Sequence, residues 1–174
     1  AFRARVGADK SPAGFATAVF VGLDANQDGA LDLFLGVNNS GSSDHVGIWP
    51  PGTGANTSPS TTTIGSPLMT YTETAANYDW RAVSAASDPA ASSYDIDGGG
   101  DTDYFVSFAV PFSDVVALLA ARGIAVDENT KMRYVMATAT QANSLNQDLN
   151  GVNGSVNSSM TWADLGVVSL PINA

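Results

Sequence analysis

Cysteine and histidine are almost missing from this 174-residue sequence, and their shortage excludes several kinds of site. Without cysteine, the chain can form no disulfide, no zinc–thiolate site and no thiol nucleophile. A hydrolase triad or a metallohydrolase centre needs histidine, and we interpret the single His45 as a surface or strand-edge residue. Haem would need axial ligands, and His45 with four scattered methionines forms no clear pair. We therefore predict no catalytic residues and no enzyme activity.

Positive charge is also scarce, with 7 basic against 17 acidic residues and a formal net charge of −10. So few basic groups cannot neutralise a row of phosphates, so neither nucleic acid nor an anionic membrane surface is an expected partner. No apolar run reaches the roughly 18 residues of a membrane span, so membrane insertion is not expected. Ala1 is consistent with the start of a mature chain after removal of a signal peptide. We predict a secreted, extracellular or cell-surface protein.

The length and the 44% hydrophobic content predict one folded domain over residues 1–174. Only 14% of the residues are charged, and Ser, Thr, Asn and Gly take their place, which suits strands and turns better than helices. Apolar residues with a period of two mark nine candidate strands between Gly-, Ser-, Asn- and Pro-rich turns. They are Phe2–Val6, Thr17–Leu23, Ala30–Val37, His45–Trp49, Leu68–Thr72, Trp80–Ser84, Tyr104–Val110, Lys131–Thr140 and Gly166–Leu170. The sequence predicts a mainly β fold, an antiparallel β-sandwich of jelly-roll or immunoglobulin-like type.

One helix is predicted over Asp114–Arg122. Ser113 is the expected N-cap, and Gly123 the expected left-handed stop. Two stretches, Pro50–Pro67 and Gln141–Ser159, have few large apolar residues and are predicted to be long surface loops.

Aspartate accounts for all acidic residues except Glu73 and Glu128. It is concentrated in two nonapeptides, Asp24–Asp32 and Asp95–Asp103. The first has side-chain oxygens at positions 1, 3, 5 and 9, and the second has carboxylates at positions 1, 3, 7 and 9. Calcium takes about six or more oxygen ligands, and alternate positions of a tight, glycine-containing loop can supply them. We predict two calcium sites, with the ligands Asp24, Asn26, Asp28 and Asp32 in the first and Asp95, Asp97, Asp101 and Asp103 in the second. The alternative is a pair of acidic turns with Asx-type hydrogen bonds and no ion. Paired-carboxylate glycosidase chemistry is not expected, because most acids belong to these loops.

The first nonapeptide resembles the first half of an EF-hand loop, but Leu35 stands at the twelfth position in place of glutamate. Both nonapeptides, closing with Asp at position 9, resemble the calcium hairpins of integrin-type propeller blades and thrombospondin-type repeats.

The segment Tyr104–Asp114, with Pro-Phe-Ser-Asp after an apolar strand, resembles a strand-to-helix corner of family 9 carbohydrate-binding modules and related DOMON-like sandwiches. The stretch Thr138–Asp148 is similar to one in comparable domains of large bacterial surface proteins. These resemblances imply a sandwich over roughly residues 15–150. Such sandwiches include sugar binders, haem binders and purely structural modules.

Two functions remain open at this point. The first is a structural subunit of an extracellular assembly, such as a surface layer, matrix or filament. For this function we expect self-association, with the strand Phe2–Val6 inserted into the sheet edge of a neighbour. An ordinary edge strand within one subunit explains this segment equally well. The second is a carbohydrate-binding module, in which Trp49, beside Pro50 and Pro51, is the best candidate for a sugar platform on a polysaccharide.

Overall fold

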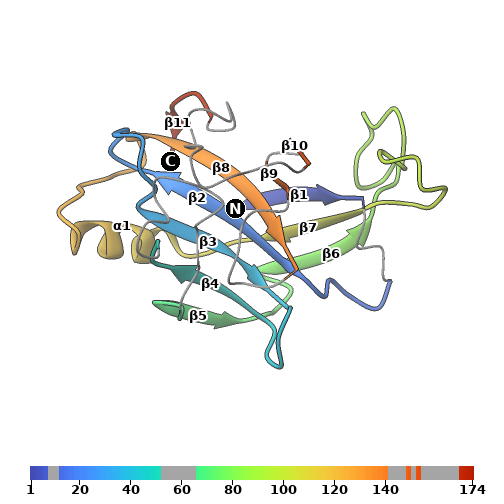
Figure 1. The fold of residues 1–174 in the computed structure, drawn as a ribbon, viewed down its shortest axis with the longest axis horizontal. Helices are drawn as coiled ribbons and strands as arrows, with labels where there is room; N and C mark the ends of the chain where they lie inside the picture. Colours follow the sequence, from blue (N-terminus) through green and yellow to red (C-terminus); the bar gives the residue numbers. More distant parts are fainter. Residues whose placement is uncertain (8–11, 52–65, 141–147, 150–151, 154–168) are drawn as a thin grey trace.

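The computed structural model describes residues 1–7, 12–51, 66–140, 148–149, 152–153 and 169–174. Its strands form two antiparallel sheets, which we call the small and the large sheet (Figure 1). The small sheet has the order β1-β7-β6, with β1 at Phe2–Val6, β7 at Tyr104–Phe108 and β6 at Tyr78–Ala82. The large sheet has the order β10-β9-β8-β2-β3-β4-β5, and β11 also pairs with β8. Its strands are β2 Ala18–Asp24, β3 Leu33–Asn38, β4 His45–Trp49, β5 Met69–Thr72, β8 Lys131–Ala139, β9 Asp148–Leu149, β10 Val152–Asn153 and β11 Ile172–Asn173.

The core lies between the two sheets. Alternate residues of β2, Val19, Val21 and Leu23, belong to one buried cluster with Val106 and Phe108 of the small sheet. Alternation follows from the pleat of a strand, which points successive side chains to opposite faces. The predicted mainly β, antiparallel sandwich is therefore confirmed.

The outward face of the large sheet is buried as well, which simple alternation did not predict. Phe20, Phe34 and Trp49 lie on this face, and each is at most 1% exposed. Neighbouring glycines make room for the rings: a Cβ on Gly36 would lie 2.6 Å from Phe20, and one on Gly47 would lie 2.7 Å from Trp49. The apolar runs of β2 and β3 thus serve two buried faces, as continuous rather than alternating apolar strands do.

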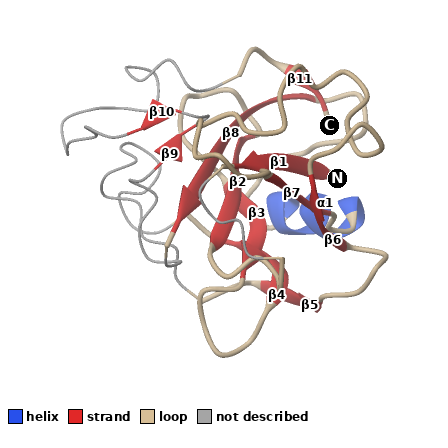
Figure 2. Cartoon of the chain, turned by 90° about the vertical axis from the view of Figure 1, so that its right-hand side faces the viewer, coloured by secondary structure: helices blue, strands red, loops and turns tan. Residues whose placement is uncertain are grey.

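The helix α1 spans Phe112–Ala120 and lies at one end of the sandwich (Figure 1); it is the one helix of the described residues (Figure 2). It begins two residues earlier than predicted, with Pro111 and not Ser113 at the N-cap position. The carbonyl of Pro111 accepts the amides of Asp114 and Val115, and the proline has no N–H of its own to leave unpaired. Gly123 has a φ of 81°, so the predicted left-handed stop is confirmed.

Other boundaries differ modestly from the predictions. The middle strands begin or end within about three residues of the expected positions. Part of the predicted loop Gln141–Ser159 forms β9 and β10, and the rest of it lies outside the described residues, as does most of Pro50–Pro67. In the predicted strand Gly166–Leu170, residues 166–168 also lie outside them; Ser169 donates its amide to the carbonyl of Tyr134 at 2.8 Å.

Candidate metal loops

The two aspartate-rich nonapeptides are Asp24–Asp32, which we call loop 1, and Asp95–Asp103, which we call loop 2. Loop 1 joins β2 to β3, and loop 2 immediately precedes β7. They lie at opposite ends of the sandwich (Figure 1). Any ion in one loop therefore has a ligand set separate from that of the other.

The first residue of each loop makes the same hydrogen bonds. Asp24 accepts the amides of the fifth and sixth loop residues at 3.1 and 3.0 Å, through one carboxylate oxygen each. Asp95 accepts the amides of the corresponding residues at 3.1 and 2.7 Å, again through one oxygen each. Loop 2 adds a third bond, because Asp95 also accepts the amide of Gly98 at 2.8 Å. In both loops the chain thus turns around the carboxylate of the first residue.

The third and ninth positions repeat this agreement. Asn26 and Asp97 each accept the amide of the fifth loop residue at 3.0 Å. Asp32 and Asp103 accept the amide of the second loop residue at 2.8 and 3.0 Å. In each loop the amide of the ninth residue also donates to the carbonyl of the residue before the loop, at 2.6 and 2.8 Å.

The backbone conformations agree too. The fourth residues, Gln27 and Gly98, have φ values of 62° and 75°, and the sixth residues, Gly29 and Gly100, have 90° and 86°. Left-handed conformations cost a residue with a Cβ about 1–2 kcal/mol, which explains glycine at the sixth position of both loops. Two segments far apart in the sequence therefore adopt the same loop conformation.

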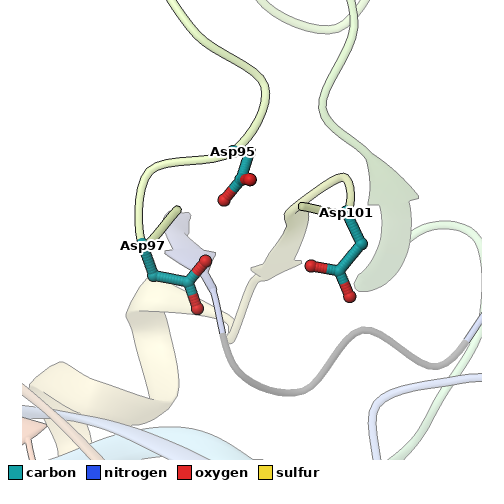
Figure 3. A group of neighbouring side chains, drawn as sticks. All are labelled: Asp95, Asp97 and Asp101. Atoms are coloured by element: carbon teal, nitrogen blue, oxygen red, sulfur yellow. The ribbon is translucent and has the colours of Figure 1, made fainter. Parts of the chain in front are cut away.

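Loop 2 gathers three carboxylates. Asp95, Asp97 and Asp101 each offer an oxygen within 4.8 Å of the others, and Figure 3 shows the three side chains turned toward one another. Among the described residues, this is the only group of three or more His, Cys, Asp or Glu side chains that comes so close. Asp97 and Asp101 are exposed and Asp95 is half-buried, so an ion could reach them from solvent.

Loop 1 engages its carboxylates differently. Asp28 at position 5 accepts the amide of Ala30 at 2.8 Å and the side-chain amide of Asn26 at 2.9 Å. The three acids of this loop do not approach one another as closely as those of loop 2. They still interact: burial first, and then the charges of Asp28 and Asp24, raise the pKa of the Asp32 carboxyl above its usual 3.8, against the lowering effect of the Ala25 amide.

Each loop buries one carboxylate, at different positions. In loop 1 it is Asp24 at position 1, which is 1% exposed; in loop 2 it is Asp103 at position 9, which is 0% exposed. Oδ2 of Asp103 accepts a hydrogen bond from Nε of Arg5 at 2.6 Å and lies 2.6 Å from Nη2 of the same residue, as an ion pair. Oδ1 of Asp103 is buried with no hydrogen-bond partner. Buried carboxylates are costly unless they are paired, so this bare oxygen is unusual.

Sequence reasoning did not identify Arg5 as a partner of loop 2, because the two meet through the pairing of β1 with β7. An Arg-x-Arg pattern in Phe2–Val6 marks an outward strand face, but not what lies beside it. Gln27 was also missed: its side-chain amide donates to the carbonyl of Lys131 at 2.8 Å and ties loop 1 to β8.

The structure corrects the role expected for Trp49. Its ring lies in the buried outward layer, 5.0 Å from the ring of Phe20, and only 1% of the residue is exposed. A sugar platform needs an exposed ring face, so Trp49 cannot provide one. His45 lies at the start of β4, with its ring 5.7 Å from Trp49 and Nδ1 2.8 Å from the carbonyl of Ser43.

The oxygen-rich side chains of both loops are of the kind that a hard cation prefers. In loop 2 the three carboxylates within 4.8 Å repel one another by about 1 kcal/mol per pair in water and more near a protein surface. A divalent ion would remove that repulsion.

The comparisons add no family. No protein-family model, curated protein or solved structure matches this chain, so the resemblances drawn from the sequence remain predictions. No helix among the described residues combines the length and apolar character needed to cross a bilayer.

Proposed function

We propose that this chain is a secreted, non-catalytic β-sandwich that binds calcium in loops 1 and 2 and serves as a structural subunit of an extracellular assembly. The observation that carries the proposal is the duplicated loop: two distant segments share one hydrogen-bond scheme, and both direct side-chain oxygens into a turn. A solvated acidic turn would need no such repetition at two ends of a molecule.

Calcium is the cation of choice for these ligands. It accepts carboxylate and carbonyl oxygens in flexible numbers, whereas magnesium demands a near-ideal octahedron and keeps several waters. Loops this exposed suit weak sites, which fill at the millimolar calcium of extracellular fluids. This reasoning supports an extracellular location.

The assembly role rests on the small sheet. β1 is an edge strand that pairs with β7 of its own chain, and its other edge pairs with no described strand. Exposed strand edges are templates for strands of other molecules. We therefore propose β1 as the element of self-association, by addition to a sheet edge of a second copy. The carbohydrate-binding alternative has lost its candidate residue, because Trp49 is buried.

Calorimetric titration and thermal unfolding test the calcium sites. We expect two sites and, at a calcium concentration about a hundred times each dissociation constant, about 2.7 kcal/mol of stabilisation per site. Excess chelator should lower the melting temperature clearly. An unchanged melting curve in chelator, with no heat of binding, contradicts the proposal.

Two matched variants assign the sites. Asp28→Asn alters loop 1 and Asp97→Asn alters loop 2, and each replaces one exposed carboxylate by its isosteric amide. Each should remove or weaken one site and leave the other unchanged, because the ligand sets are separate. Two unchanged sites in either variant would show that the altered residue is not a ligand.

A further inference from the structure

The carboxyl end of β1 lies against loop 2. The strand runs antiparallel to β7, and its last pair, Val6 with Tyr104, sits directly after Asp103. A Cβ on Gly7, the next residue, would lie 3.3 Å from the carboxylate of Asp97. The edge strand and the third position of the loop are therefore in close contact.

Arg5 joins the two ends of loop 2, Ser93 just before it and Asp103 at its end, which we call the neck. Its guanidinium donates to Asp103 at the end of the loop and, through Nη2, to the carbonyl of Ser93 before its start at 2.7 Å. A change in the separation of these two acceptors would remove Arg5 from one or both of them. Arg5 is thus one of the contacts that hold β1, beside its five-residue pairing with β7.

Asp103 is not one of the three clustered carboxylates, but one of its buried oxygens lacks a hydrogen-bond partner. Its Oδ2 accepts the amide of Ile96, so the carboxylate lies inside the base of the loop. Its Oδ1 is buried and has no hydrogen-bond partner. A carboxylate can accept on both oxygens at once, so Arg5 can hold Oδ2 of Asp103 while Oδ1 stays available to a cation in the loop.

On the basis of the function proposed above, we propose that the cation of loop 2 holds β1 on its own sheet, and that its removal frees the edge of β7 for the strand Phe2–Val6 of a second copy. Without the ion, repulsion among Asp95, Asp97 and Asp101 opens the neck. Arg5 then loses its two acceptors, and β1 is held only by its ladder with one neighbour and by its apolar face.

A second copy is the fitting occupant, because its own β1 matches the edge of β7. Five consecutive residue pairs, from Phe2 with Phe108 to Val6 with Tyr104, are formed within the chain. Exchange of identical strands between copies preserves every one of them. Loop 1 serves as the control for this coupling, since Gln27 joins it to β8 of the large sheet.

Hydrogen exchange of the full chain, followed by mass spectrometry with calcium or with chelator, tests the coupling. In the wild type, the amides of Phe2–Val6 should exchange at least about tenfold faster in chelator. Asp97→Asn should abolish this response, and Asp28→Asn should retain it. Arg5→Met, which removes the guanidinium that holds Asp103, should leave β1 fast in both calcium and chelator.

The absence of cysteine allows a direct test of strand exchange. Residues 3 and 107 face each other across β1 and β7. When a chain with Arg3→Cys is mixed with a chain with Ser107→Cys, a disulfide joining these positions can form only between copies. We expect it to form in chelator and to be suppressed about tenfold by calcium, whereas both cysteines on one chain should join within it in calcium.

The outcomes separate this inference from the proposed function. If calorimetry finds no calcium at loop 2, both fail. If calcium binds there but β1 exchanges equally fast with and without it, or faster with it, the coupling is wrong and the calcium site stands. If chelator frees β1 but no disulfide forms between copies, a second copy is not the occupant.

Discussion

Loops 1 and 2 share a backbone and differ in how they are anchored. Loop 1 buries its first carboxylate, Asp24, and connects two strands of the large sheet directly. Loop 2 buries its last carboxylate, Asp103, and uses it to hold an arginine from another strand. One hydrogen-bond scheme can therefore be built in as a tight hairpin connection or as a clamp on a sheet edge. The local sequence therefore determines the conformation of the turn, whereas the neighbouring strands determine what the turn holds in place.

The largest effect should come from the buried ion pair of loop 2. Breaking a buried pair costs about 3–5 kcal/mol, and because Arg5 is 20% exposed we expect about 2–3 kcal/mol for Asp103→Asn in chelator. Urea unfolding measures it. The corresponding Asp32→Asn in loop 1 is the control, and an equal loss there would erase the distinction between the two ninth positions.

The next largest effect should separate the first positions. Asp24→Ala removes the acceptor of two amides in a buried place, and we expect a loss of about 2 kcal/mol in chelator. Asp95→Ala removes the acceptor of amides that water can reach, so the loss should stay below about 1 kcal/mol. Chemical unfolding of both variants checks the order, and a greater loss for Asp95→Ala contradicts it.

Glycine at the sixth position should show what the loops have in common. At Gly29 and Gly100 a Cβ would meet nothing within 4 Å, so the cost of alanine is that of the backbone conformation alone. We expect about 1 kcal/mol for Gly29→Ala and the same for Gly100→Ala in chelator. Clearly unequal losses would show that the two backbones differ in solution.

The smallest effect concerns Asp32 and has the opposite sign. Its pKa is raised in the folded state, so between pH 3.8 and the raised value the folded protein binds more protons than the unfolded chain. Stability in chelator should therefore fall as pH rises through this window, and Asp32→Asn should escape that loss. Urea unfolding between about pH 3 and 7 should show the variant more stable than the wild type at neutral pH, with no difference below pH 3.8. In calcium the order should reverse, and a variant less stable in chelator at neutral pH would refute the assignment.

The apolar pattern predicted strands well and their surroundings poorly. Phe2–Val6 and His45–Trp49 match the structure at both ends, because each has apolar residues at alternate positions and is followed by a turn-forming residue, Gly7 or Pro50. The predicted exposure of Trp49 was wrong for a physical reason. Period-two alternation identifies one buried face of a sheet, and both faces of the large sheet are buried at this residue. The glycines between the apolar residues of β2, β3 and β4 were the available signal, since they leave space for large rings.

The start of the helix shows a competition between two signals. Ser113 is a good N-cap by composition, yet Pro111 occupies the N-cap position, and its carbonyl accepts the amides of Asp114 and Val115 at 3.1 and 3.4 Å. Asp114, in the first turn of the helix, accepts the hydroxyl of Tyr71 from β5 at 2.6 Å. Burial and this hydrogen bond to the charged Asp114 both raise the pKa of Tyr71. Such a contact depends on tertiary packing and has no local signature.

By itself, the sequence determined the strands, the positions of both loops and the side-chain oxygens within them, because turn conformation and oxygen spacing are encoded by consecutive residues. Only the tertiary structure decided that three carboxylates of loop 2 converge, that Trp49 is buried and that Arg5 holds Asp103. These features depend on which strands become neighbours, and Arg5 meets Asp103 only through the antiparallel register of β1 with β7. Burial between sheets is a collective result of the whole chain.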